Sequence, residues 1–266
     1  MGYYPPRVLV AEAKRSGVEI LPIDINHSTG EYTVEDGAIR ISLRQLKGMS
    51  EEALKSILAA REDREFVSLM DFIMRTEINR PIVENLIKVR AFDSFDNRED
   101  LLHDLARIIE ARQMVGKGTR PLFADMKPEH AAATVFSDRR INMISERSLL
   151  SLSLSAHPFD FLALGEGFIR MIDLRKMATG QRVKIAGSVI RYQTSPTRNG
   201  NRVVYVIMED GTGIADVTVF SDVQKKYGDV LFKEGWLIVE GKVQRRGPKA
   251  MSIIAEKILP LSVSTS

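Results

Sequence analysis

The spacing of apolar residues changes once along this 266-residue chain, and the change limits the folds that the chain can adopt. Up to about residue 115, apolar residues recur every three or four positions, as at Leu54, Ile57 and Leu58, which is typical of amphipathic helices. From Gln181 the period becomes two, which is typical of strands. The pattern therefore predicts an α+β multidomain protein, with a mostly helical N-terminal region over residues 31–115 and strands at the C-terminus.

Five short alternating runs follow Gln181, and a helical stretch from Ser221 to about Leu231 separates the third run from the fourth. This order predicts an OB-fold, a small five-stranded β-barrel. Residues 209–213 contain two glycines and are expected to form the turn between the second and third strands. The apolar residues that alternate are Val183, Ile185, Gly187 and Val189, then Val203, Tyr205 and Ile207, then Ala215, Val217 and Val219, then Leu237, Val239, Gly241 and Val243, and finally Ile253 and Ala255.

Local signals mark the ends of several helices in the N-terminal region. Ser50 is a good N-cap for the helix that follows it, and Asn79-Arg80-Pro81 starts a further helix, with Pro81 in its first turn. Gly17 is placed to end a short first helix, and a last helix is expected from about Arg98 to Gln113. Residues 116–121 form the clearest linker in the chain.

Composition narrows the class of protein. The chain has no cysteine, which excludes disulfides, thiolate zinc sites and cysteine nucleophiles. No apolar run approaches the roughly 20 residues that cross a bilayer, and no secretory signal is visible, so we expect a cytoplasmic protein without membrane contact. The net charge is +3, but residues 182–257 hold 13 basic and 8 acidic side chains. This local excess would suit a polyanionic partner, although many solvated surfaces carry as much.

The residue patterns of catalysis and metal binding are missing from the sequence. The 4 histidines lack the spacing of metal ligands, and no phosphate-binding Gly-x-x-x-x-Gly-Lys loop is present. Asp24 and the Glu209-Asp210 pair are candidates for a two-metal site by composition alone. Both lie at expected turns, so we interpret them as turn formers. We therefore expect no catalytic residue, no metal and no cofactor in this chain.

A glycine-containing turn is the first feature that predicts binding. Lys47, Gly48, Met49 and Ser50 link two predicted helices, and such a hairpin directs backbone N–H groups and a helix N-terminus outward, where a phosphate oxygen can bind. Contacts of this kind hold a duplex without reading its sequence. An ordinary helix–helix turn also favours glycine, so the motif leaves both interpretations open.

The second feature is the basic character of two predicted barrel loops, residues 193–202 and 245–249, by which OB-folds commonly hold oligonucleotides. We expect the cations in and beside these loops to follow phosphates and the aromatic residues to stack on bases. One of the aromatic residues is expected to pack in the barrel instead, as is Trp236. The cations are Arg191, Arg198, Arg202, Arg245, Arg246 and Lys249, and the aromatic residues are Tyr192, Tyr205 and Phe220.

Five motifs in a fixed order resemble the bacterial C-family DNA polymerases, the alpha subunit of DNA polymerase III. Residues 3–26 resemble the end of the fingers region, residues 41–48 the start of the helix–hairpin–helix region that follows, and residues 79–93 its second half. Residues 146–159 resemble the linker motif before the OB domain, and residues 183–259 resemble that domain. Each motif is weakly specific, whereas five in the order of the family are strong.

This resemblance implies that the two domains bind different parts of the DNA. The helix–hairpin–helix region would hold the duplex backbone and the OB-fold would hold single-stranded template, in replication or repair synthesis. The palm carboxylates of the family lie upstream of everything matched, so catalysis would belong to another part of the polymerase or to a partner chain. The chain ends just beyond the barrel, as in the error-prone branch. The implied segments are a fingers remnant over 1–38, a helix–hairpin–helix domain over 39–115, a linker with helices over 116–180 and an OB-fold over 181–260.

Three positions depart from the family pattern. Arg90 stands where the second hairpin usually has glycine, Ser50 where the first often has another glycine, and Ser151 replaces a glycine of the linker motif. Backbone donation to phosphate is therefore not expected at Arg90, whose guanidinium could supply charge instead. A second hypothesis stays open, in which the chain docks on polymerase partners without binding nucleic acid. Exposed apolar residues on the helix over 98–113 would favour it.

Overall fold

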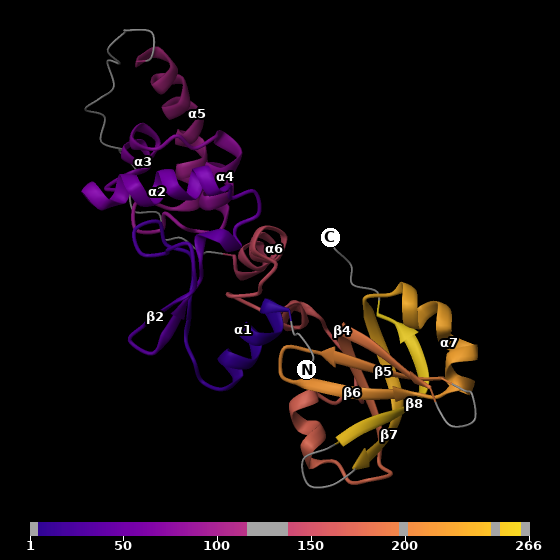
Figure 1. Cartoon of the computed structure of the whole chain (residues 1–266). Helices are drawn as coiled ribbons and strands as arrows, with labels where there is room; N and C mark the ends of the chain where they lie inside the picture. Colours follow the sequence, from indigo (N-terminus) through magenta and orange to yellow (C-terminus); the bar gives the residue numbers. More distant parts are fainter. Residues whose placement is uncertain (1–4, 116–137, 197–201, 246–250, 262–266) are drawn as a thin grey trace. The chain divides into compact units, whose positions relative to one another are not determined.

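The chain folds into two compact units, Met1–Ala156 and His157–Ser266 (Figure 1). The computed structural model describes residues 5–115, 138–196, 202–245 and 251–261. The first unit is mostly helical with a small sheet, and the second is a closed β-barrel, which confirms the predicted α+β fold. The finer division into four segments stays a prediction. In these described ranges no helix is both long enough and apolar enough to cross a membrane.

Serine and asparagine side chains cap the N-termini of three α-helices of the first unit. The side-chain oxygens of Ser50, Ser68 and Asn79 each accept the backbone N–H of the third residue of the helix that follows. The cap predicted at Ser50 is confirmed, and so is the helix start predicted at Asn79-Arg80-Pro81. The described elements of this unit are α1 (Pro6–Arg15), the 3-10 turn η1 (Leu43–Gln45), α2 (Glu51–Asp63), α3 (Leu69–Arg75), α4 (Arg80–Lys88), α5 (Arg98–Val115) and α6 (Arg139–Leu150).

Left-handed residues end three of these helices. Beyond α1 lies Gly17 with φ +84°, and beyond α4 lies Arg90 with φ +69°. In both cases the N–H of the next residue bonds back to a carbonyl of the last helical turn, the pattern of a Schellman cap. Ser151, at the end of α6, has φ +55°. Two of the positions that depart from the glycines of the resembled family, Arg90 and Ser151, are therefore positions where glycine would be less strained.

The first unit contains a small sheet, of which the two strands beyond residue 31 lie in a stretch expected to be mostly helical and were missed. It consists of β1 (Ile20–Leu21), β2 (Thr33–Glu35) and β3 (Ala38–Arg40), in the order β1-β3-β2. β2 and β3 are joined by Asp36 and Gly37, both with positive φ. An Asp-Gly pair between short extended segments is a strong hairpin signal, because a two-residue turn of this type needs positive φ at both positions.

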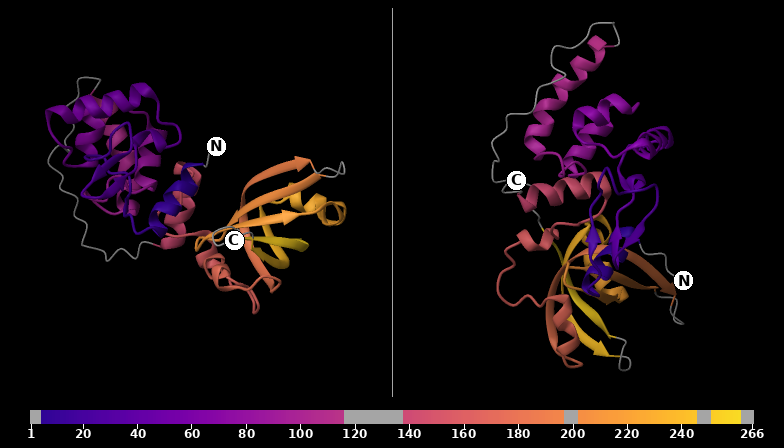
Figure 2. Two further views of the ribbon diagram at one scale, coloured as in Figure 1. Left: turned by 60° about the horizontal axis from the view of Figure 1, so that its bottom comes forward. Right: turned by 90° about the vertical axis from the view of Figure 1, so that its left-hand side faces the viewer.

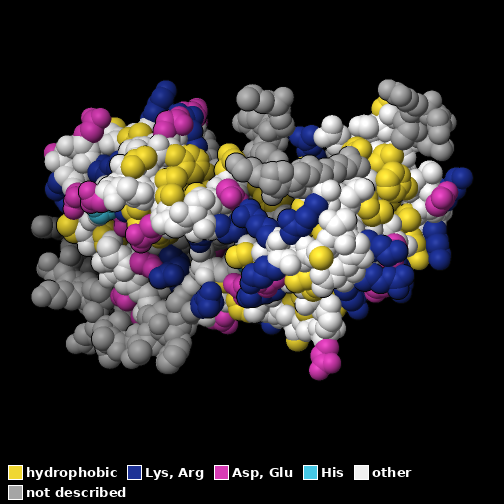
Figure 3. Space-filling model, turned by 90° about the horizontal axis from the view of Figure 1, so that it is seen from below, with side chains coloured by type: hydrophobic (Ala, Val, Ile, Leu, Met, Phe, Trp, Pro, Cys, Tyr) yellow, Lys and Arg dark blue, Asp and Glu magenta, His cyan; other side chains and the backbone are white. Residues whose placement is uncertain are grey.

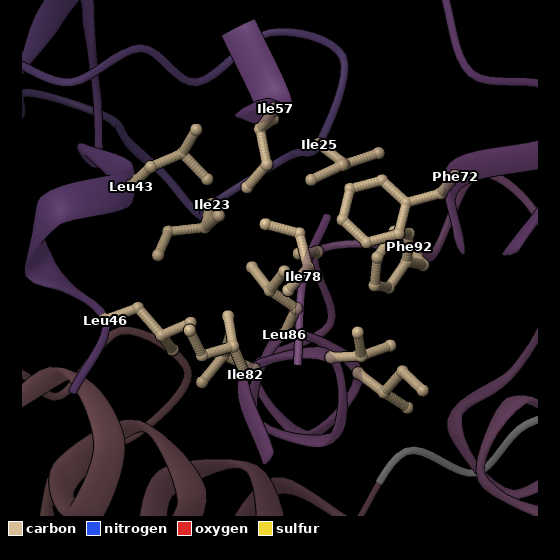
Figure 4. Packing of buried hydrophobic residues seen from close by; sticks show 14 of the residues in the cluster. Ile23, Ile25, Leu43, Leu46, Ile57, Phe72, Ile78, Ile82, Leu86 and Phe92 are labelled. Carbon is tan, nitrogen blue, oxygen red and sulfur yellow. The ribbon is translucent and has the colours of Figure 1, made fainter. Parts of the chain in front are cut away.

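The core of the first unit joins segments that are far apart in the sequence (Figure 4). Phe66, Phe72 and Phe92 form two edge-to-face contacts, each with ring centroids 5.0 Å apart. Ile23 and Ile25, which follow β1, are buried in the same cluster. Because this core also holds η1 and α2, it fixes the turn between them.

The second unit is a closed barrel in the order β4-β5-β6-β8-β7 (Figures 1 and 2). Only β6 and β8 pair in parallel, and α7 lies beside one end of the barrel. Two 3-10 turns, η2 and η3, precede the strands. The bounds are η2 (Pro158–Phe161), η3 (Met171–Lys176), β4 (Arg182–Pro196), β5 (Arg202–Glu209), β6 (Ile214–Val219), α7 (Ser221–Lys233), β7 (Trp236–Arg245) and β8 (Met251–Pro260).

Alternate residues of each strand fill the barrel interior. In β5 the interior residues are Val204, Val206 and Met208, so Tyr205 and Ile207 lie on the outer side. Residues on both sides of this strand are apolar, so the sequence pattern could not show which side faces the barrel interior. The prediction that Trp236 packs inside the barrel is wrong. This side chain is half-buried outside the interior cluster and stacks on Phe159, with ring centroids 5.2 Å apart.

Candidate nucleic-acid interface

The first hairpin, Lys47 to Ser50, forms one exposed turn between η1 and α2. Gly48 has φ +89°, a conformation that favours glycine. Lys47 and Ser50 are exposed, whereas Met49 is half-buried against the core. The four residues predicted as a phosphate-binding turn therefore lie together, with one of them directed into the protein.

Two backbone groups of the first hairpin are used within the fold. The N–H of Lys47 donates to the carbonyl of Leu149 at 2.7 Å, and the N–H of Met49 donates to the carbonyl of Leu46 at 3.0 Å. The expectation that hairpin N–H groups point outward is therefore wrong for Lys47 and Met49. The physical reason is that Leu149 lies in the last turn of α6, whose carbonyls have no partner inside the helix.

The N-terminus of α2 is already close to negative charge. Its first two residues are Glu51 and Glu52, and the guanidinium of Arg44 bonds to Glu51. The backbone N–H of Glu52 and the hydroxyl of Ser50 hold the pKa of the Glu52 carboxyl below its usual range. A phosphate would have to displace these carboxylates to reach the helix N-terminus. The exposed ammonium of Lys47 is therefore the group of this turn that is best placed to bind an anion.

Arg90 shares its charge with an acid. Its guanidinium lies 2.5 Å from the carboxylate of Asp93. Burial raises the pKa of the Asp93 carboxyl, and the hydrogen bond from Arg90 acts in the opposite direction. The positive charge expected at the second hairpin is therefore partly compensated before any ligand binds.

The outer side of three barrel strands presents a different surface, which we call the strand face. Across it, Arg191, Ile207 and Asp216 are neighbours in register, and so are Gln193, Tyr205 and Thr218. The Nη2 of Arg191 donates to Oε1 of Gln193 at 2.9 Å. The strand face is defined by Arg191 and Gln193 on β4, Tyr205 and Ile207 on β5, Asp216 and the buried Thr218 on β6, and Phe220 directly after β6.

A β-bulge decides which residues of β4 reach the strand face. Regular alternation from Val189 would turn Arg191 inward and Tyr192 outward. The register shifts by one residue between Val189 and Arg191. Arg191 therefore lies on the outer side of the barrel, and Tyr192 points inward. Gln193, Ile207 and Asp216 were missed as members of this face. The register that brings them together is set by the bulge and was not readable from the sequence.

Two of the predicted aromatic residues lie together on the strand face. Tyr205 is half-exposed and Phe220 is 43% exposed. Phe220 has extended backbone angles and lies two residues beyond Thr218, the register partner of Tyr205. Residues in this diagonal relation are typically about 7–8 Å apart. Two rings at this spacing can each offer a face to one base.

The third predicted aromatic residue has a structural role instead. Tyr192 points toward the barrel interior, and its hydroxyl donates to the carbonyl of Leu231 in α7 at 2.5 Å. Its ring lies 5.6 Å from the ring of Phe232, and burial raises the pKa of its hydroxyl. Tyr192 therefore anchors α7, and the expectation that its ring is free for a base is corrected.

The predicted cations of the barrel divide into several groups. Arg245 donates from Nε and Nη2 to the carbonyl of Met177, at 3.3 and 3.0 Å, and also to the carbonyl of Arg175, so it caps η3. Arg202 is exposed at the start of β5. Arg198, Arg246 and Lys249 lie outside the described residues. Arg245 thus has a fold-stabilising role that the sequence did not indicate.

Three cations of the barrel strands that lie outside the strand face are paired with acids. Arg182 and Lys242 both lie near Glu256, at 3.7 and 3.0 Å, and Lys184 lies 3.9 Å from Glu240. Figure 3 shows Lys and Arg side chains interleaved with hydrophobic side chains over the part of the barrel in view. Part of the positive charge of the barrel is therefore neutralised by neighbouring acids before any ligand binds.

Of the candidate carboxylates, Asp24 and Asp210 form turns as predicted, whereas Glu209 is the buried last residue of β5. The Oδ1 of Asp210 accepts the N–H groups of Thr212 and Gly213, at 2.8 and 3.0 Å, and its Oδ2 accepts the N–H of Met171. The Oδ1 of Asp24 accepts the N–H of Asn26 at 2.8 Å. Among the described residues, no group of three or more His, Cys, Asp and Glu is placed to hold a metal ion.

Comparison with known proteins gives the same two domains. Residues 17–101 match the family model of the helix-hairpin-helix motif, and residues 183–261 match that of the OB-fold nucleic acid binding domain. An error-prone DNA polymerase of Symbiobacterium thermophilum is 33% identical over 93% of this chain and 27% of its own length. One of Bdellovibrio bacteriovorus is 29% identical over 98% of this chain and 26% of its own length. The chain thus spans about a quarter of these relatives. This is consistent with the C-terminal region of a C-family polymerase and confirms the resemblance.

Proposed function

We propose that this chain is the DNA-binding C-terminal part of an error-prone C-family DNA polymerase, and that its strand face holds single-stranded DNA. The observation that carries the proposal is the placement of Tyr205 on the outer side of β5, beside Gln193 and diagonal to both Arg191 and Phe220. OB-folds bind oligonucleotides through the face of their second and third strands, which are β5 and β6 here.

In this proposal the bases and the phosphates have separate partners. Successive bases stack on Tyr205 and Phe220, which tolerates any sequence because every base has a π-face. The phosphates run along the side of Arg191 and Arg202, where cations are exposed or half-exposed. The phosphate contacts supply affinity and the stacking fixes the position of the strand.

The helical unit has a smaller role in the proposal. Lys47 contacts a phosphate of duplex DNA, and Arg90 adds charge where its contact with Asp93 allows. Nucleotide transfer belongs to the palm, which the resemblance locates upstream of this region, or to a partner chain that carries it. The partners are therefore DNA and the catalytic part of the polymerase, and the site of action is the cytoplasm.

The interaction-module hypothesis depended on exposed apolar residues of α5. Leu101, Leu105 and Ile108 are instead buried in the core of the first unit. Leu102 and Ile109 pack against the same core. The described side chains of α5 therefore support DNA binding over docking through this helix.

Fluorescence anisotropy of the full chain with a labelled single-stranded oligonucleotide, at two salt concentrations, tests the proposal. We expect binding that weakens as salt rises, because phosphate contacts release counterions. A duplex of the same length and a neutral polymer serve as comparison ligands. Binding that is absent, or indifferent to salt, contradicts the proposal.

A further inference from the structure

We infer that Asp216 makes the strand face prefer bases that carry an exocyclic amino group, such as cytosine, over thymine. This inference rests on the proposed function, since it assigns a selectivity to the same face. Its starting point is an acidic side chain in the middle of a surface otherwise suited to a polyanion.

Asp216 lies next to the proposed stacking position. It is the register partner of Ile207 on β5, and it stands two residues before Thr218, the partner of Tyr205. Asp216 and Phe220 therefore lie along β6 on opposite sides of the position that faces Tyr205. A base stacked on Tyr205 would have its edge within reach of the Asp216 carboxylate.

The Asp216 carboxylate is also unoccupied, whereas three other acids of the second unit have basic neighbours. Glu240 lies near Lys184, Glu256 bonds to Lys242, and Asp229 is 2.9 Å from Lys233. Over the described ranges, Asp216 has neither an ion-pair partner nor a hydrogen-bond partner. The residue is exposed, but burial raises the pKa of its carboxyl, so part of the group is shielded from water. An acceptor in such surroundings gains from a donor that a ligand brings.

The chemistry of a carboxylate gives the selectivity. An ionised carboxylate only accepts hydrogen bonds and repels phosphate, so the sugar-phosphate chain is kept away from β6 and toward Arg191. The edge that then faces Asp216 belongs to a base. Cytosine offers the N4 amino group, a donor that carboxylates accept, whereas thymine has the O4 acceptor at the same position.

The test compares oligo-dC and oligo-dT of equal length in the anisotropy assay at low salt and neutral pH. We expect the full chain to bind oligo-dC about fivefold more tightly, the lower end of the discrimination that one good base contact gives. In Asp216→Ala the two affinities should become equal, and oligo-dT should bind more tightly than before because a repulsive charge is gone. In Asp216→Glu, which keeps the carboxylate, a preference for oligo-dC should remain.

Glu240→Ala is the matched control, because it removes the same charge from an outer position of β7 beside Lys184. It should leave the ratio of the two affinities unchanged. Equal, salt-dependent binding of both oligonucleotides by the unaltered chain overturns this inference but leaves the proposed function standing. A ratio that persists in Asp216→Ala also overturns it. Absence of salt-dependent binding to either oligonucleotide overturns both.

Discussion

The hairpin over Lys47 to Ser50 and the strand face of the barrel differ in what folding leaves free for a ligand. In the hairpin, the N–H of Lys47 is bonded to Leu149, and the Ser50 oxygen accepts the N–H of Ala53 at 3.1 Å. Met49 turns into the core. On the strand face, Tyr205 and Asp216 project outward, and neither is needed to complete the backbone hydrogen bonds of the sheet.

The difference follows from how each structure satisfies its backbone. A turn between helices lies between helix ends, whose N–H and C=O groups have no partner within the helix. Nearby polar groups are therefore used to close the turn. In a sheet the backbone groups bond to the neighbouring strands, and the side chains stand perpendicular to them. A strand surface can thus be specialised for a ligand without loss of backbone hydrogen bonds.

The largest expected effect is that of Tyr205→Ala. Loss of one stacking ring should weaken binding of single-stranded DNA about tenfold, since stacking contributes about 1–3 kcal/mol per base. Anisotropy titration measures it. Tyr205→Phe keeps the ring and should retain the affinity. Unchanged binding in Tyr205→Ala would mean that the strand face is not the main binding surface.

Arg90→Gly tests whether backbone geometry outweighs charge at the second hairpin. Because a left-handed conformation costs a non-glycine residue about 1–2 kcal/mol, the substitution should stabilise the first unit by about 1 kcal/mol after loss of the contact with Asp93. Urea denaturation measures the free energy of unfolding. Arg90→Ala removes the same charge without relieving the backbone and should show no gain. Destabilisation by glycine would indicate that the contact with Asp93 is the stronger effect.

Ser50→Ala tests the structural role of the first hairpin. Loss of the cap on α2 should destabilise the first unit by about 1 kcal/mol. Binding of single-stranded DNA should stay the same, because the hydroxyl already accepts the N–H of Ala53. Ser50→Thr keeps a capping oxygen and serves as the control for stability. A clear loss of affinity without loss of stability would show that Ser50 contacts the ligand.

The smallest expected effect is a change in the salt dependence of DNA binding, which should differ between variants of Arg191 and Lys47. In Arg191→Ala, the slope of log affinity against log salt for single-stranded DNA should fall by about 0.7, the value for one phosphate contact. Lys47→Ala should leave that slope unchanged and lower the slope for duplex DNA. Lys242→Ala is the control, because Lys242 is already 3.0 Å from Glu256. Equal changes in the Arg191 and Lys242 variants would refute the division between free and paired cations.

Several features of the candidate site could not be read from the sequence. The β-bulge in β4 exchanges the sides of the sheet on which Arg191 and Tyr192 lie. The alternation of residues along β4 does not indicate this bulge. The two-phase apolar pattern of β5 hides the outward position of Tyr205. Arg245 looked like a loop cation, but its partners are carbonyls of residues 175 and 177. Each of these roles depends on a segment distant in the chain.

Features that depend only on neighbouring residues follow from local sequence patterns. The change of apolar period fixed helices first and a barrel last, and single residues such as Gly17, Ser50 and Asn79 marked helix ends, because their hydrogen bonds close within a few positions. Which polar groups stay free, in contrast, depends on the packing of segments that are distant in the chain. The N–H of Lys47 meets a carbonyl of α6, and Asp216 meets no partner among the described residues. Such outcomes depend on which surfaces pack together, and short-range patterns carry no information about that.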